Sequence, residues 1–159
     1  MNLFGLMETS GGAMEAERMR AEVVAANMAN AETTRTASGG PYRRQEVVFA
    51  ADQGDPSFLN SMNAASQPAG PAANDPLGSA AVAPGVHIAA VIQDPSPPLK
   101  RYDPGHPDAD AQGYVSYPDI NPITEMVDLM GATRAYGLNG SAVQAEKTMI
   151  SSALEIAKS

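Results

Sequence analysis

The sequence predicts an α+β protein in which long N- and C-terminal helices pack together as an α-helical core beside a small β-rich middle segment. Apolar residues recur every three or four positions at both ends of the 159-residue chain, as in helices that pack along a partner. The middle holds short strand-like runs between proline-rich turns. Aromatic residues make up only 5% of the chain and Trp is absent, so a large independent core is not expected. We therefore assign 1–34 and 122–159 to the helical core and 35–121 to the middle segment.

The first helix is expected over residues 3–31. Its apolar seam consists of Leu3, Met7, Ser10, Met14, Glu17, Ala21, Val24, Met28 and Ala31. Gly11 and Gly12 weaken this helix by about 1 kcal/mol each relative to Ala. Asn27 and Asn30 fall near its C-terminal end, where an Asn adopts the left-handed conformation or bonds free carbonyls. From spacing alone, an ordinary helix end is favoured over a joint between subunits.

The middle segment is expected to contain four strands, at residues 42–49, 86–92, 99–102 and 113–117. Between the first two lies an insertion, at about 51–84, that is rich in Ala, Pro, Gly, Ser and Asn and is expected to be flexible or loosely packed. Arg43 and Arg44 would point to opposite faces of the first strand. They would pair with carboxylates of a neighbouring subunit or lie at a solvated edge.

The last helix is expected to begin at Asn121-Pro122, with Glu125 near the positive end of the helix dipole. Its seam consists of Met126, Leu129, Thr133, Tyr136, Gly140, Val143, Lys147, Ile150, Leu154 and Ala157. A helix of this length is about 50 Å long and needs a partner, for which the N-terminal helix of the same chain is the obvious choice. We hypothesise that both ends are marginally stable in the free monomer and become ordered by packing between subunits.

Composition excludes several classes of function. The net charge of −8 argues against a nucleic-acid partner, and the absence of cysteine excludes disulfides and thiol chemistry. Residues 1–17 contain no Lys or Arg, so a cleaved secretory signal is not expected. His87 and His106 have no nucleophile at motif spacing, so we expect no enzyme, no cofactor and no small-molecule substrate.

One stretch has the residue order of a calcium-binding EF-hand loop. Its members are Asp108, Asp110, Gln112, Gly113, Val115 and Asp119. Prolines at positions 104, 107 and 118 are incompatible with the helices that should flank such a loop. A turn that leads into a strand is the favoured interpretation, and no metal site is expected.

Four strings of residues carry a resemblance to a known family. They are Val-Val-Ala-Ala-Asn-Met-Ala-Asn at 23–30, Gly-Gly-Pro-Tyr-Arg-Arg at 39–44, Tyr-Asp-Pro-Gly-His-Pro-Asp-Ala-Asp at 102–110 and Ala-Thr-Arg-Ala-Tyr at 132–136. Together they resemble the flagellar basal-body rod proteins, and within them the proximal-rod, FlgC-type members. The resemblance covers residues 1–50 and 85–158, in order and with compatible spacing.

The resemblance implies a structural subunit of the proximal rod, a hollow, torque-transmitting periplasmic axle required for bacterial motility. It implies export by the flagellar type III apparatus without a cleaved signal peptide, with copies of the same chain and other rod proteins as partners, near the inner-membrane ring and the export apparatus. The residues expected to pack between subunits are Met14, Val24, Asn27, Met28, Asn30, Met126, Leu129, Tyr136, Asn139, Val143, Ile150 and Leu154.

The alternative is a monomeric periplasmic binding module whose two ends form a closed helical hairpin. A monomer needs one buried stripe on each helix, whereas a subunit of a tube needs apolar contacts on several faces. Apolar residues flank both seams, at Leu6, Ala16, Val23, Ile123, Val127 and Met130. These residues favour several neighbours.

Overall fold

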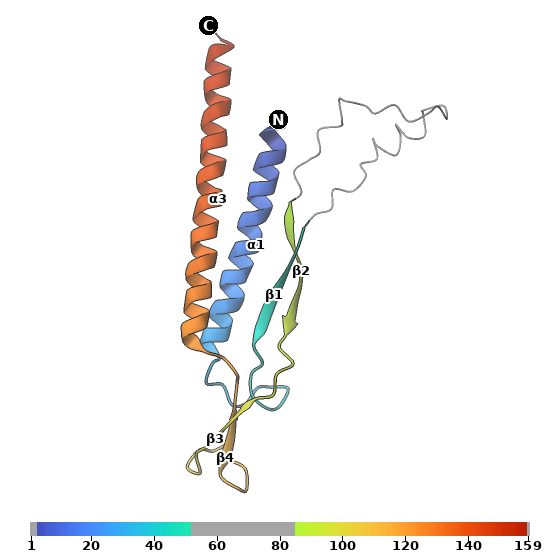
Figure 1. Ribbon diagram of the computed structural model, residues 1–159, viewed down its shortest axis with the longest axis vertical. Coiled ribbons are helices and arrows are strands. Elements are labelled where there is room, and N and C mark those ends of the chain that lie inside the picture. Colours follow the sequence, from blue (N-terminus) through green and yellow to red (C-terminus); the bar gives the residue numbers. More distant parts are fainter. Residues whose placement is uncertain (1–2, 52–84, 159) are drawn as a thin grey trace, which may run out of the picture.

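The computed structural model describes residues 3–51 and 85–158. In chain order the elements are α1 (Leu3–Ala29), β1 (Gln45–Ala51), β2 (Val86–Gln93), β3 (Leu99–Tyr102), β4 (Tyr114–Tyr117) and α3 (Pro122–Ile156). Two long terminal helices and a small middle part with strands confirm the α+β prediction (Figure 1). The expected insertion at 51–84 lies, apart from Ala51, outside the described residues.

The two helices pack against each other in antiparallel directions (Figure 1). The C-terminal end of α1 meets the first turn of α3, where Asn27 bonds Glu125. Because α3 has 35 residues and α1 has 27, the last turns of α3 extend beyond the start of α1. The expected pairing of the two helices within one chain is therefore confirmed. Within the described ranges, no helix is long and apolar enough to cross a membrane.

The helix α1 lies between α3 and the β1–β2 hairpin (Figure 1). Gly12 favours the close approach of the hairpin, because a Cβ at this position would lie 3.2 Å from the carbonyl oxygen of Val86, a tight contact. Val23 lines a groove together with Val47 and Phe49 of β1. The chain's own hairpin thus covers part of the apolar surface that flanks the α1 seam. That part is therefore weaker evidence for neighbouring subunits than the sequence suggested.

The face of α3 that meets α1 is shifted from the predicted seam. Its buried residues are Glu125, Ala132 and Glu146. Met126, Thr133 and Tyr136, which the seam includes, are exposed in the single chain. Small and polar side chains allow α1 to approach closely, whereas the larger apolar side chains of the seam lie at the margin of the contact or outside it. Apolar periodicity therefore located the helix correctly but not the face that α1 covers.

Asparagines stabilise the start of α3 and the end of α1. The Oδ1 atom of Asn121 accepts the N–H of Ile123 at 3.0 Å, and Pro122 occupies the first helical position, as predicted. At the end of α1, the amide of Asn30 donates to the carbonyl of Ala26 at 2.9 Å. No non-glycine residue in the described chain has a positive φ, so the left-handed alternative for Asn27 and Asn30 is wrong.

Each pair of strands forms a separate two-stranded antiparallel sheet. In the first sheet Gln45 pairs with Gln93 and Ala51 with Val86, with a register shift at Val48/Phe49. In the second, Leu99 pairs with Tyr117 and Tyr102 with Tyr114. This smaller hairpin lies beyond the junction of the two helices (Figure 1).

The strand β1 begins three residues later than the predicted start at position 42. The N–H of Tyr42 donates to the carbonyl of Thr33 at 3.0 Å, which folds residues 33–42 into a loop beneath the end of α1. Tyr42 and Arg44 therefore approach the helices before the chain enters the sheet.

Candidate functional site at the helix–strand junction

Asn27 is completely buried where α1, α3 and β1 meet. Its amide nitrogen donates to the carbonyl of Gln45 at 2.9 Å and to Oε2 of Glu125 at 3.1 Å. Its carbonyl oxygen accepts the N–H of Gln45 at 2.9 Å and the hydroxyl of Tyr42 at 3.1 Å. The amide thus uses both donors and both acceptor positions. We call Asn27, Tyr42, Arg44, Gln45 and Glu125 the helix–strand junction.

The second link in the junction is an ion pair. The carboxylate of Glu125, only 1% exposed, accepts a hydrogen bond from Nε of Arg44 at 2.6 Å. The guanidinium of Arg44 also contacts Glu46 and lies 3.9 Å from Asp128. Arg44 was expected either to pair with a neighbouring subunit or to be solvated, but its carboxylate partners lie in its own chain. A buried pair adds little net stability, yet removing one partner leaves an uncompensated charge.

The titration of two junction groups reflects this arrangement. Burial alone would lower the pKa of Arg44, but the hydrogen bond and charge of Glu125, together with Glu46, outweigh burial and raise it. Burial, and then the negative charge of Glu125, raise the pKa of Tyr42 above its ordinary value. Both shifts favour the protonated form, which is the form that donates the junction's hydrogen bonds.

A further ion pair crosses between the helices one to two turns away. Arg20 of α1 donates to Asp128 of α3 at 3.2 Å, and it also lies 3.7 Å from Glu17. About one third of the Arg20 and Asp128 side chains is exposed, so this pair adds little to stability. It specifies the same helix register as the Asn27–Glu125 bond.

The structure places the residues predicted to pack between subunits in three environments. Val24 and Asn27 are buried within the chain. Seven are half-buried: Met14, Met28, Asn30, Leu129, Asn139, Val143 and Ile150. The methyl group of Met14 lies 3.9 Å from the position that a Cβ on Gly140 would occupy. Met126, Tyr136 and Leu154 are exposed. Only Asn27 is part of the junction.

The sequence did not predict that Glu125 bonds both Arg44 and Asn27. Glu125 was assigned only to the dipole of α3, and Asn27 was assigned to the end of α1 and to packing between subunits. Glu125 and Ala132 are seven residues apart and share a helical face, but the sequence did not predict that this face is buried, and only its burial makes a partner for the carboxylate necessary. Which cation would supply it depended on the path of residues 33–44.

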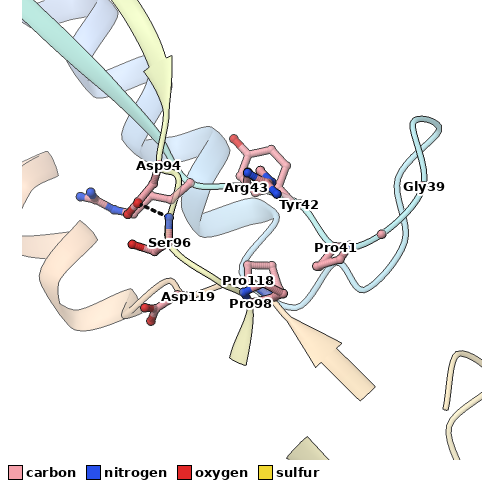
Figure 2. Close-up of a pocket in the computed structure, with 11 residues that line it drawn as sticks. Gly39, Pro41, Tyr42, Arg43, Asp94, Ser96, Pro98, Pro118 and Asp119 are labelled. Carbon is pink, nitrogen blue, oxygen red and sulfur yellow. Dashed lines mark hydrogen bonds between the residues drawn. The ribbon is translucent and has the colours of Figure 1, made fainter. Parts of the chain in front are cut away.

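A shallow pocket adjoins the junction, with a volume of about 140 Å³ (Figure 2). Three prolines from different segments line it, together with Arg43 and Asp94. The backbone N–H of Ser96 donates to Asp94 at 2.8 Å, and hydrogen bonds from Ser96 lower the pKa of Asp94. A carboxyl group that ionises this readily is a poor general acid near neutral pH.

The residues of the calcium-like loop have other roles. Oδ1 of Asp110 accepts the N–H groups of Gln112 and Tyr114 at 2.9 and 2.8 Å, and Gly113 has a φ of 81°. Asp108 accepts a hydrogen bond from Thr34 at 2.8 Å. The described part of the chain contains no group of three His, Cys, Asp or Glu side chains that could hold a metal ion. The segment forms a turn stabilised by Asp110 before β4.

The junction fixes three elements relative to one another. It joins the end of one long helix, the start of the other and the first strand by hydrogen bonds to a single buried amide, reinforced by a buried ion pair. Such a network specifies one relative orientation of the three elements. It offers no nucleophile paired with a base.

Comparisons with known proteins show which family the chain belongs to. Residues 7–35 match the family described as "Flagella basal body rod protein", and residues 111–156 match "Flagellar basal body rod FlgEFG protein C-terminal". The chain is 38% identical to the flagellar basal-body rod protein FlgC of Borreliella burgdorferi over 98% of both chains. It is 38% identical to FlgC of Bacillus subtilis over 99% of this chain and 100% of the relative, and 33% identical to FlgC of Salmonella typhimurium over 94% of each. The chain therefore belongs to the FlgC family of flagellar basal-body rod proteins and is a structural subunit of the flagellar rod.

Proposed function

We propose that the chain assembles through α1 and α3 into the wall of the proximal rod, a hollow axle that transmits torque in the basal body. One observation carries this proposal. The helix α3 is covered by α1 on one side only, and large apolar side chains remain exposed along the rest of it: Ile123, Met126, Val127, Met130, Tyr136, Leu138, Met149, Leu154 and Ile156. An exposed apolar surface of this extent is typical of a protein that is completed by neighbours.

The same proposal divides the chain. Residues 1–34 and 122–159 would contribute the helical core of the rod wall, and residues 35–121 would contribute the outer, β-rich part. The helix–strand junction joins the two parts, with Asn27 bonded to both Gln45 and Glu125. Torque that passes along the packed helices would therefore reach the outer part through a rigid connection.

The neighbours in this proposal are copies of the same chain and other rod proteins, with the inner-membrane ring and the export apparatus nearby. The chain would lie in the periplasmic space and reach it without a cleaved signal peptide. It would catalyse no reaction, bind no cofactor and have neither nucleic acid nor a small molecule as a partner. The resemblance to rod proteins supports these statements, and the net charge of −8 supports the absence of nucleic acid.

The packing residues proposed from the sequence include three that are exposed in the single chain, namely Met126, Tyr136 and Leu154. These three would be covered by neighbouring subunits. The last turns of α3 have no cover from α1, since residues 151–158 are all exposed. We propose that these turns become fully ordered only in the assembly, a hypothesis that a dilute monomer with full helix content by circular dichroism would contradict.

A charge placed on α3 tests the proposal directly. Tyr136→Lys should leave the fold of the isolated chain unchanged, because Tyr136 is already 42% exposed. In cells that lack the chromosomal copy, the variant should be missing from purified basal bodies, and the cells should not swim. Leu99→Lys is the control, since Leu99 is an exposed apolar residue of β3, in the outer part.

Normal incorporation of Tyr136→Lys would contradict packing at this position. Loss of both variants would show that the outer part also lies in an essential contact. A wild-type chain that is absent from purified basal bodies and monomeric at all concentrations would favour the binding module.

A further inference from the structure

An uncovered apolar surface runs along α3, on the side away from α1. It consists of Ile123, Val127, Met130, Leu138, Met149 and Ile156, which are 54–76% exposed, with Arg134 among them. Steps of three or four residues connect these positions through the small residues between them, so they share one helical face. That face lies about half a helical turn from Glu125, Ala132 and Glu146, the residues buried against α1. We call it the outer stripe.

Arg134 is the only charged residue of the outer stripe. It is exposed, and in the described ranges it makes no ion pair. A surface that covered the apolar residues around Arg134 would also exclude water from its guanidinium. The covering surface should therefore supply a carboxylate opposite Arg134.

The exposed face of α1 has the complementary chemistry. Glu8, Glu15 and Glu22 recur every seven residues on this face, and small residues such as Gly11 and Ala25 lie exposed beside them. Glu22 is paired with Arg18 at 2.9 Å, whereas Glu15 has no ion pair among the described residues. Small residues let the larger side chains of another helix approach the backbone closely, and Glu15 is free to pair.

Resting on the rod function proposed above, we propose that the outer stripe docks on the acidic face of α1 in a second copy of the chain, with Arg134 opposite Glu15. The two surfaces differ, so the contact is head-to-tail: each copy offers one surface to each of two neighbours. Contacts of this kind generate rings or helical assemblies rather than closed dimers. Pairing of two outer stripes is less favourable, because it offers no carboxylate to either Arg134.

Cysteine crosslinking tests the pairing, and the chain has no cysteine of its own that could form other crosslinks. Glu15→Cys and Arg134→Cys are introduced into separate copies with different tags, and the two copies are produced together in cells that assemble basal bodies. A short bismaleimide should join the two tags in one product. A dominant product between two Arg134→Cys copies, a product with another protein or no product at all would each contradict the proposal.

Charge reversal provides a second test of the pairing, and this test uses no cysteine substitution. Arg134→Glu should lower the incorporation of the chain into basal bodies by about tenfold, because it places two carboxylates together. Glu15→Arg in the same chain should restore incorporation. Lys147→Glu, at an exposed position of α3 outside the outer stripe, is the matched control. An Arg134→Glu effect that Glu15→Arg does not restore would overturn the pairing.

The two proposals fail in different ways. Tagged wild-type chain in purified basal bodies, without the Glu15–Arg134 crosslink, would refute the docking mode and leave the rod function intact. Absence of the wild-type chain from basal bodies would refute the rod function itself.

Discussion

The side-chain amide of Asn27, near the end of α1, donates a hydrogen bond of 3.1 Å to Oε2 of Glu125, 98 positions later in the first turn of α3. The same amide also bonds the backbone of Gln45 at the start of β1. One buried residue thus connects the three segments that meet at the junction. The relationship explains why an Asn, with donors and acceptors on one short side chain, occupies this position.

Removal of that amide should destabilise the chain strongly. Asn27→Ala removes the partner of Oε2 of Glu125, whose Oε1 keeps its bond to Arg44, and it leaves the backbone groups of Gln45 without the bonds that Asn27 makes to them. We expect the free energy of unfolding to fall by about 2–3 kcal/mol. Urea denaturation followed by circular dichroism measures the change. Asn139→Ala is the control, because Asn139 donates only to the carbonyl of Ala135 in its own helix. Equal losses for the two variants would contradict the role of Asn27.

Arg44 should matter far more than its neighbour Arg43. Arg44→Met leaves the carboxylate of Glu125 buried and uncompensated, at an expected cost of about 3–5 kcal/mol. Arg43→Met should have an effect near zero, since Arg43 is exposed and makes no ion pair within the described residues. A double-mutant cycle with Glu125→Leu should show a coupling above about 1 kcal/mol, and additive losses would exclude a direct interaction.

The junction should lose stability at alkaline pH. The raised pKa of Tyr42 means that the fold favours the neutral phenol. This contribution is fully present below the ordinary pKa of about 10 and is lost as the pH rises through the higher folded value. The difference in unfolding free energy between wild type and Tyr42→Phe should therefore shrink between about pH 9 and pH 12. A difference that stays constant over this range would show that Tyr42 does not titrate with folding.

Two glycines with similar backbone angles should respond differently to alanine. Gly39 and Gly113 have φ values of 84° and 81°. A Cβ at Gly39 meets nothing within 4 Å, so Gly39→Ala should cost only backbone strain, about 1 kcal/mol. A Cβ at Gly113 would lie 2.9 Å from the ring of Tyr102, so Gly113→Ala should also displace that ring. Thermal unfolding with near-ultraviolet circular dichroism of the tyrosines measures both effects, and equal shifts in melting temperature would contradict the contact.

The sequence predicted most of the local structure, because its signals are local. Asn121 and Pro122 start α3 where capping chemistry requires it. The four short strands lie within a few residues of their predicted positions. The three- and four-residue spacing located both helices, although Gly11, Gly12, Gly137 and Gly140 disfavour helix. Tertiary packing outweighs the cost of these glycines, and Gly12 also gives Val86 room to approach α1.

The junction could not be derived in the same way. Asn27, Arg44 and Glu125 are far apart in the chain, and no periodic pattern relates them. Their meeting depends on the loop that brings Tyr42 back to Thr33 and on the antiparallel register of the two helices. The face of α3 that α1 covers was also predicted with an offset, because several faces of α3 carry apolar residues and only the close fit of Ala132 and its neighbours selects one.

The sequence by itself thus determined the two terminal helices, the strand-bearing middle and the family, through periodicity, caps and residue strings that need no knowledge of distant contacts. Only the tertiary structure decided which carboxylate Arg44 neutralises, which side of α1 the hairpin covers and which side of α3 remains free. These are choices between chemically similar partners. They are settled by the geometry of close packing, since Asn27, Arg44 and Glu125 can bond one another only where the fold brings them within hydrogen-bonding distance.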